Sequence, residues 1–309
     1  MYNEDSKGLT YSAGFFILIA FFFAGTIAGL LVSMPIWMFM TGQSPLNMAK
    51  DMLNPNYVNG IRMVQVVSTF FGFFVPAYAT AFLLNRKPTK LLGFKTHFNL
   101  KQFLVMLLIM VVAIFFAGAL SEINQRIPLS KSLAEYFKHL EDMYSDQVQA
   151  TANIKTVKDY ILSLIIIGLL PAIFEETFFR GGLQNFLVRS TKAPWVSILI
   201  VSILFSLAHF SYYGFLWRLA LGVILGLIYQ YTGSIWLSVL GHFFNNGLGV
   251  TEMYILARQG KSFKDNMDET YPIWWGVIAL VILIALFYYL KLFSKELQKK
   301  YAVSDKLTV

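Results

Sequence analysis

Six ionisable side chains lie within stretches of the sequence that are otherwise apolar, and they are the first candidates for chemistry. These residues are Glu175, Glu176, Arg180, His209, Arg218 and His242. A charged residue at the centre of a membrane-spanning helix costs roughly 3 kcal/mol, so such residues mark functional sites by default. The remaining histidines, His97 and His139, lie in polar connections and need no such explanation.

The first motif runs Pro171-Ala-Ile-Phe-Glu175-Glu176-Thr-Phe-Phe-Arg180. Glu176 and Arg180 are four residues apart, which places them on one helix face with the acid first, the favourable order for an ion pair. Glu175 lies about 100° further round the helix and can point elsewhere. We therefore predict that Arg180 neutralises Glu176 while Glu175 stays free for chemistry. The alternative is a salt-bridged cluster that only fixes helix packing.

Two further motifs each supply a histidine. Phe205-Ser-Leu-Ala-His209 ends one apolar stretch, and Gly241-His242-Phe-Phe-Asn245-Asn246 lies inside another. His242 and Asn246 are four residues apart, so on a helix the amide can orient the imidazole or donate a hydrogen bond beside it. The alternatives are a packing or interfacial role for His209, and polar contacts between helices for His242 and Asn246.

Helix geometry predicts that the motifs converge. Counted from the short connection at 190–194, Glu175 lies about 21 Å along one helix and His209 about 22 Å along the next, at 1.5 Å per residue. His242 lies about 12 Å from its own turn and reaches the same depth if the first turn extends about 10 Å further into solvent.

A carboxylate, two imidazoles and an amide that converge inside a membrane suit hydrolysis. Glu175 would act as general base, with His209 helping to hold and deprotonate a water molecule. His242 and Asn246 would donate hydrogen bonds to the oxyanion of a tetrahedral intermediate. A metal mechanism is also open, because Glu175, His209 and His242 match a catalytic set of two histidines and one carboxylate for Zn²⁺ or another divalent metal. The residues alone do not separate the two mechanisms, and they indicate no other cofactor.

Together the three motifs resemble the signature of the CPBP family of intramembrane proteases. The resemblance rests on Glu175-Glu176-x-x-x-Arg180, Phe205-x-x-x-His209 and His242-x-x-x-Asn246, and it covers about 158–252. The family comprises CAAX-prenyl endopeptidases, bacteriocin-processing proteases and proteins similar to lysostaphin resistance protein A.

This resemblance implies a hydrolase: a glutamate-dependent intramembrane endopeptidase, of a kind often described as a metalloprotease. Its catalytic residues would be Glu175, Glu176, Arg180, His209, His242 and Asn246. The implied partners are a peptide or protein substrate, C-terminal or prenylated, and the lipid bilayer. Nucleic acid is not among them, because a net charge of +8 on a membrane protein is mostly a property of loops that face anionic lipid.

Two other functions use the same residues. Buried Glu and His side chains also form proton relays, so a proton-coupled transporter is one alternative. The sequence shows no pair of matching broken helices in two halves, which an inverted-repeat transporter would have. The second alternative is a non-catalytic membrane scaffold.

The elements that must position these residues are membrane-spanning helices. Of the 309 residues, 57% are apolar and 14% charged, against about 25% charged in soluble proteins. A spanning helix needs about 20 apolar residues and satisfies its own backbone hydrogen bonds, so long apolar runs predict helices. We predict an all-α, polytopic integral membrane bundle with eight transmembrane helices, over 13–40, 63–84, 102–120, 160–186, 195–210, 216–231, 234–250 and 273–290. The sequence has no cysteine, which excludes disulfides and thiolate zinc sites.

The chain is expected to divide into three regions. Residues 1–157 hold three transmembrane helices and an outer connection with an amphipathic helix near 129–150, 158–252 form the catalytic four-helix region, and 253–309 hold the last transmembrane helix and a basic tail. Lys and Arg concentrate between the second and third helices and after the last one, and cytoplasmic loops carry this excess. Both termini are therefore predicted to be cytoplasmic, in a multi-pass protein of a bacterial inner membrane.

Overall fold

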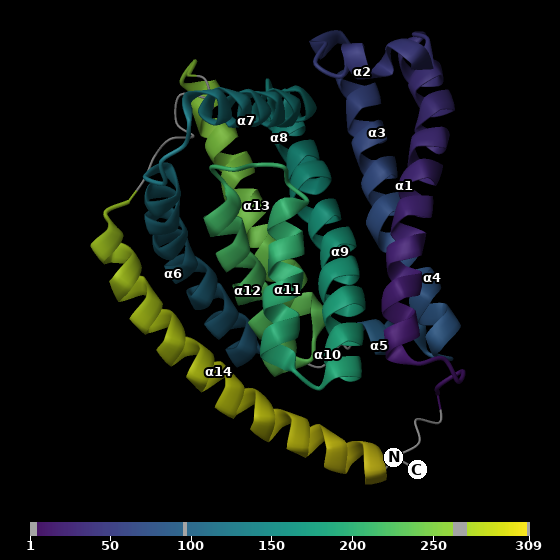
Figure 1. Ribbon diagram of the computed structural model, residues 1–309, viewed down its shortest axis with the longest axis vertical. Helices are drawn as coiled ribbons and strands as arrows, with labels where there is room; N and C mark the ends of the chain where they lie inside the picture. The colour runs from purple at the N-terminus through teal and green to yellow at the C-terminus, as the bar shows by residue number, and fades with distance from the viewer. Residues whose placement is uncertain (1–4, 95–97, 262–270, 308–309) are drawn as a thin grey trace.

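The computed structural model describes residues 5–94, 98–261 and 271–307, with side chains up to residue 297. Helices make up every long element (Figure 1). Within these ranges no strand forms, and an isolated bridge joins Ser6 and Asn85. The all-α class is confirmed, and the apolar helices make this an integral membrane protein.

The N-terminal region forms two long antiparallel rods. Helix α1 (Tyr11–Thr41) begins at Thr10, whose side chain accepts from the amide of Ala13, and ends at Gly42 with a φ of 68°. The second rod consists of α3 (Val58–Thr69), the π-helix η3 (Phe70–Phe74) and α4 (Val75–Leu84). The short elements around them are η1 (Pro45–Asn47), α2 (Met48–Asp51), η2 (Pro55–Tyr57) and α5 (Pro88–Leu92).

One continuous helix, from Val157 to Thr191, carries the first motif. It consists of α8 (Val157–Ser163), the π-helix η4 (Leu164–Leu169), α9 (Leu170–Glu176), the π-helix η5 (Thr177–Gln184) and α10 (Asn185–Thr191). The Gly181-Gly182 pair does not break it, because the π-helical turns of η5 run through both glycines. Such π-helical turns inside α-helices are rare, and those that occur are frequently found at functional sites.

Three further helices complete the region that holds the three motifs: α11 (Pro194–Leu207), α12 (Phe215–Thr232) and α13 (Ile235–Arg258). Helix α12 packs closely on α11 at Gly222, where an added Cβ would lie 3.0 Å from the Ser202 Cα. A side chain at position 222 would push these helices apart, so this glycine brings the backbone of α12 near the site.

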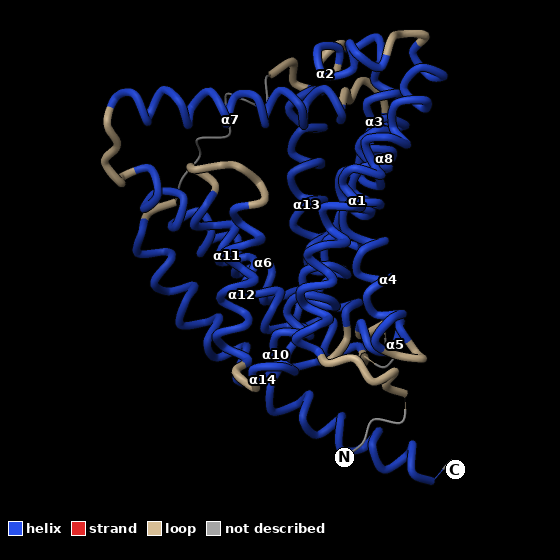
Figure 2. Tube along the Cα trace, turned by 45° about the vertical axis from the view of Figure 1, so that its right-hand side comes forward, coloured by secondary structure: helices blue, strands red, loops and turns tan. Residues whose placement is uncertain are grey.

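Two long helices and one crossing helix enclose the rest. Helices α6 (Leu100–Gln125) and α14 (Ile273–Leu307) flank these motif-bearing helices, and α7 (Lys131–Ala152) lies across one end of the bundle (Figures 1 and 2). The predicted amphipathic helix thus forms as α7. Arg62 of α3 donates to the carbonyls of Thr151 and Ala152 and lies 3.5 Å from Asp159, which ties the end of α7 to two other helices.

In the described part of the chain, six helical segments are long and apolar enough to cross a membrane: Tyr11–Thr41, Pro55–Leu84, Leu100–Gln125, Val157–Thr191, Phe215–Thr232 and Ile273–Leu297. The other two predicted spans are also helical, but Pro194–Leu207 has only 14 residues and α13 carries several polar side chains. The polytopic bundle is confirmed, while the count of eight stays a prediction. The start of α1 and the last turns of α14 lie at the end of the molecule opposite α7 (Figure 1).

Candidate active site

Glu176 is the fully buried centre of the polar cluster. Its Oε1 accepts hydrogen bonds from Arg180 Nη1 at 2.9 Å and from His242 Nδ1 at 2.9 Å. The predicted ion pair of Glu176 and Arg180 is confirmed, with side-chain exposures of 0% and 1%. An ionised carboxylate only accepts hydrogen bonds, so Nδ1 of His242 carries a proton. In neutral His242, Nε2 is then the ring nitrogen with the lone pair.

Glu175 lies on the other side of the same imidazole. Its Oε2 is 4.0 Å from His242 Nε2 and, although buried, makes no hydrogen bond. Both carboxylates therefore face His242, one bonded to Nδ1 and the other near Nε2. A separation of 4.0 Å is too long for a direct hydrogen bond and is one that a bridging water can span.

His209 follows directly after α11. Its Nδ1 lies 2.8 Å from the carbonyl oxygen of Phe205, which only accepts, so this nitrogen donates. The Phe205 ring contacts both imidazoles, with centroid distances of 4.9 Å to His209 and 5.7 Å to His242. In the described part of the chain, no ion pair within 4.0 Å joins His209 to Glu175.

Asn246 lies one turn beyond His242 on α13, as its spacing predicts. Its Nδ2 donates to the carbonyl of Ile167 in η4 at 3.4 Å, and its Oδ1 accepts from Asn245 at 3.4 Å. A normal N–H···O hydrogen bond is about 2.7–3.2 Å long. Both bonds of Asn246 are longer, so its side-chain amide is held weakly. Glu176, and not Asn246, orients the imidazole of His242.

Arg218 lies apart from the carboxylates. It is 4% exposed in the first turn of α12, and its guanidinium lies 4.6 Å from the Trp217 ring and 5.1 Å from the Tyr144 ring of α7. The structure thus places five of the six intramembrane ionisable residues around Phe205 and His242, and the sixth beneath α7.

Sequence reasoning gave no role to Phe205 or to the backbone of Gly222. The Arg180 guanidinium lies 4.8 Å from the centre of the Phe205 ring, and its Nη2 donates to the Gly222 carbonyl at 3.1 Å. Phe205 shares a helix face with His209 by the four-residue spacing, which was a usable signal. The Gly222 carbonyl belongs to another helix, and no residue type or spacing in the sequence indicates that Arg180 bonds to it.

The arrangement does not fit the predicted three-ligand metal site. Across the described ranges, no three His, Asp or Glu side chains are placed to hold one ion. Glu175 and the Nε2 of His242 face each other at 4.0 Å, and the bond at Nδ1 of His209 leaves Nε2 as its free ring nitrogen. We therefore route no catalytic step through a metal.

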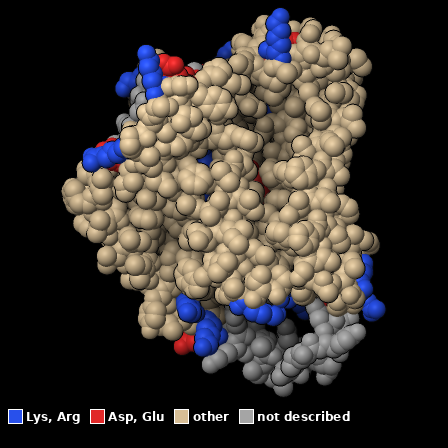
Figure 3. All heavy atoms as spheres, in the orientation of Figure 1, with Lys and Arg blue, Asp and Glu red and all other residues tan. Residues whose placement is uncertain are grey.

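One face of the molecule has a recess. A space-filling view shows it in the upper half of this face, beside the surface over α1 and α3, with atoms of acidic residues visible inside it (Figure 3). Glu175 has a side-chain exposure of 14%, while Glu176 has none. Of the two neighbouring acids, Glu175 is therefore the more exposed one.

Comparison with known proteins agrees with this geometry. Residues 157–248 match the family model described as type II CAAX prenyl endopeptidase, Rce1-like. An uncharacterized 24.3 kDa protein of Escherichia coli is 38% identical over 101 residues, which is 31% of this chain and 46% of that protein. The chain thus spans about half the length of this curated relative. No solved structure matches the chain.

The matched segment contains all three motifs and ends two residues after Asn246. It nearly coincides with the predicted catalytic region 158–252. The family resemblance drawn from the motifs is therefore confirmed over residues 157–248, which match the model of the Rce1-like type II CAAX prenyl endopeptidases.

Proposed function

We propose that this protein is an intramembrane endopeptidase in which Glu175 activates a water molecule. The observation that carries the proposal is the buried Oε2 of Glu175, which has no hydrogen-bond partner and lies 4.0 Å from the Nε2 of His242. An unpaired buried carboxylate is costly to a fold. Its place beside a histidine whose other nitrogen is fixed by Glu176 is the arrangement that a general base requires.

The water would bridge Glu175 Oε2 and His242 Nε2. Glu175 takes a proton from the water as its oxygen attacks the scissile carbonyl, and then returns that proton to the leaving amine. His242 accepts a hydrogen bond from the water at Nε2, because Glu176 keeps its proton on Nδ1. Glu176 and Arg180 act as positioning residues, since they hold His242 and touch no reacting atom.

The oxyanion would form near Asn246. The Nδ2 of Asn246 is a neutral donor whose bond to Ile167 is long, so it can turn to the intermediate at little cost. His209 would contact the water or the substrate through Nε2, because its Nδ1 is bonded to Phe205. This division of roles moves His242 to the water, whereas the sequence suggested His209 there.

The proposed substrate is a peptide or protein segment that reaches the site through the bilayer. The family resemblance makes C-terminal or prenylated peptides candidates, and the proposed location is a bacterial inner membrane with both termini cytoplasmic. The three-region division of the chain is proposed on the same basis.

The test is hydrolysis by purified protein in lipid nanodiscs, with a mixture of membrane-derived peptides in ¹⁸O-labelled water. We expect new peptide carboxylates that carry the label, because water is the nucleophile. Glu175→Gln should abolish the products, and Glu135→Gln on the exposed side of α7 is the matched control that should keep them. Equal products from the parent and Glu175→Gln, or none from the folded parent, would refute the proposal.

A further inference from the structure

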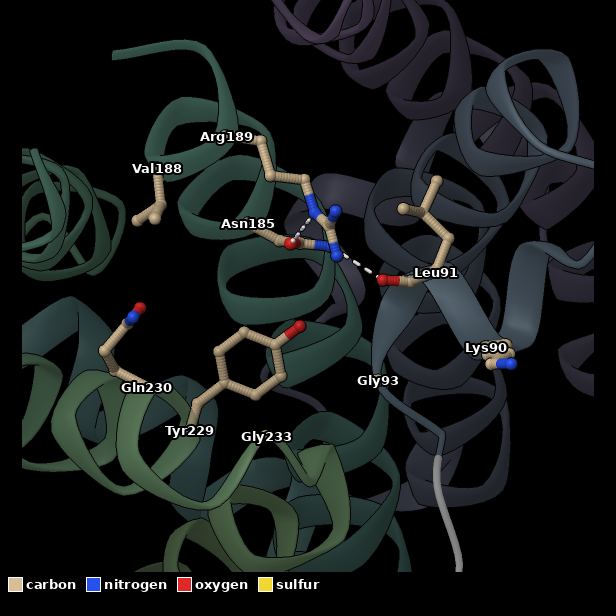
Figure 4. A pocket seen from close by; sticks show the side chains of 9 residues that line it. All are labelled: Lys90, Leu91, Gly93, Asn185, Val188, Arg189, Tyr229, Gln230 and Gly233. Atoms are coloured by element: carbon tan, nitrogen blue, oxygen red, sulfur yellow. Dashed lines mark hydrogen bonds between the residues drawn. The ribbon is translucent and has the colours of Figure 1, made fainter. Parts of the chain in front are cut away.

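A second cavity lies at the end of the molecule opposite α7, far from the carboxylates. It has a volume of about 240 Å³, opens to the surface and is lined by residues of α5, α10 and the end of α12. Its polar lining comes mainly from Asn185, Tyr229 and the exposed Lys90 and Arg189 (Figure 4). Among the residues that the structure describes, no acidic side chain lines it.

Both cations of this cavity lack a counter-charge. Within the described ranges, neither Lys90 nor Arg189 lies within 4.0 Å of a carboxylate. Arg189 is nevertheless held in place: its Nε donates to Asn185 Oδ1 at 2.7 Å, and its guanidinium lies 5.1 Å from the Tyr11 ring. Asn185 is fixed in turn by donating to the Leu91 carbonyl at 2.7 Å. The guanidinium is thus oriented without being neutralised.

The cavity lies where two membrane-spanning helices end. The candidate spans stop at Thr191 and Thr232, two residues after Arg189 and three after Tyr229. Arg, Lys and Tyr side chains concentrate at this boundary between hydrocarbon and water. The phosphate groups of membrane lipids lie at the same depth.

We propose that this cavity binds the phosphate of an anionic phospholipid headgroup. An arginine presents parallel N–H groups that match two phosphate oxygens, and Lys90 adds a second charge. Basic pockets between transmembrane helices are sites for anionic headgroups. A volume of 240 Å³ lies below the roughly 300–1,000 Å³ of pockets for drug-sized ligands, which suits a headgroup better than a whole metabolite.

The C-terminal ends of the helices around the cavity repel an anion, but their partial negative charge is smaller than the positive charge of the side chains. Each helix C-terminus carries about half a negative charge, and the ends of α10 and α12 both lie here. Their sum is about one negative charge against two full positive ones. The cavity therefore keeps a net positive field, and the adjoining bilayer supplies anionic lipid at high local concentration.

The test compares lipid binding by two charge-matched double variants in phosphatidylcholine nanodiscs doped with phosphatidylglycerol. Lys90→Gln with Arg189→Gln removes the cavity charges, while Arg86→Gln with Lys192→Gln removes two exposed charges that do not line the cavity. Retained phosphatidylglycerol is counted by native mass spectrometry. Two basic residues at about 1 kcal/mol each, with 1.4 kcal/mol per tenfold, predict about 25-fold weaker binding for the cavity variant alone.

Equal loss in both double variants would show a general surface attraction and overturn the proposal. Displacement of the lipid by millimolar inorganic phosphate would identify a site for the free anion instead and would also overturn it. Arg189→Lys keeps the charge but not the paired N–H groups, so it should weaken binding by less than the double variant. If the double variant fails to fold, the comparison of Arg189→Lys with the parent provides the test.

Discussion

Glutamine in place of either of the neighbouring glutamates of α9 should abolish activity, but only one of the two variants should lose stability. Glu176→Gln leaves Arg180 buried without the carboxylate that it contacts at 2.9 Å. Removal of one partner from a buried ion pair costs about 3–5 kcal/mol in the free energy of unfolding. Glu175→Gln removes a carboxylate whose buried Oε2 makes no hydrogen bond, so we expect no loss of stability.

A double variant separates the loss of pairing from the loss of packing. Glu176→Met with Arg180→Met removes both charges and keeps apolar bulk, a replacement that is often neutral for a buried pair. His242 then lacks the acceptor for Nδ1, which costs about 1–3 kcal/mol. The double variant should therefore be more stable than Glu176→Met or Arg180→Met alone.

The assay is denaturant unfolding of the purified proteins in one detergent, with peptide hydrolysis measured in parallel. Glu175→Gln should keep the parent's unfolding midpoint and lose hydrolysis, whereas Glu176→Gln should lose both. The reasoning is refuted if the two glutamine variants are equally destabilised. It is also refuted if the double variant loses the sum of the two single losses, because that result means no coupling between Glu176 and Arg180.

Three further outcomes follow from the site. Asn246→Ala should lower kcat by about 10²–10³ if the amide donates to the oxyanion. The unfolding midpoint should change little, because the two hydrogen bonds of this amide are 3.4 Å long. An unchanged kcat would show that Asn246 does not have this role. Hydrolysis should persist through chelator treatment and should not rise on addition of Zn²⁺, and activity lost to chelator and restored by metal would contradict the metal-free mechanism. Arg62→Met should remove a donor from the carbonyls of Thr151 and Ala152, the second of which keeps its bond from Ser163 Oγ, and lower stability by about 1–3 kcal/mol, seen as faster limited proteolysis within α7.

The helices were predictable because their cause lies in the sequence alone. Apolar runs about as long as a bilayer is thick fold as helices wherever they pack, and the predicted amphipathic segment near 129–150 appears as α7 for the same local reason. Apolar length did not determine the number of spans in the same way, because Pro194–Leu207 is short and α13 carries His242, Asn245 and Asn246. Length and apolarity alone do not say how such helices cross.

Depth along the helices was harder to predict than their existence. The estimate assumed 1.5 Å per residue along regular α-helices. The helix that carries Glu175 contains π-helical turns at η4 and η5, which change both rise and rotation. The motifs still converge, but His242 meets the two glutamates while His209 contacts the ring of Phe205.

The sequence by itself determined the helices and the pairing of Glu176 with Arg180, since four-residue spacing fixes neighbours on one helix whatever surrounds it. Only the tertiary structure decided that His242 lies between two carboxylates, that the Gly222 carbonyl accepts from Arg180, and that Asn246 bonds to Ile167. These contacts join separate helices, and their geometry depends on how closely the helices pack and how each is rotated. Residue spacing along the chain contains neither quantity.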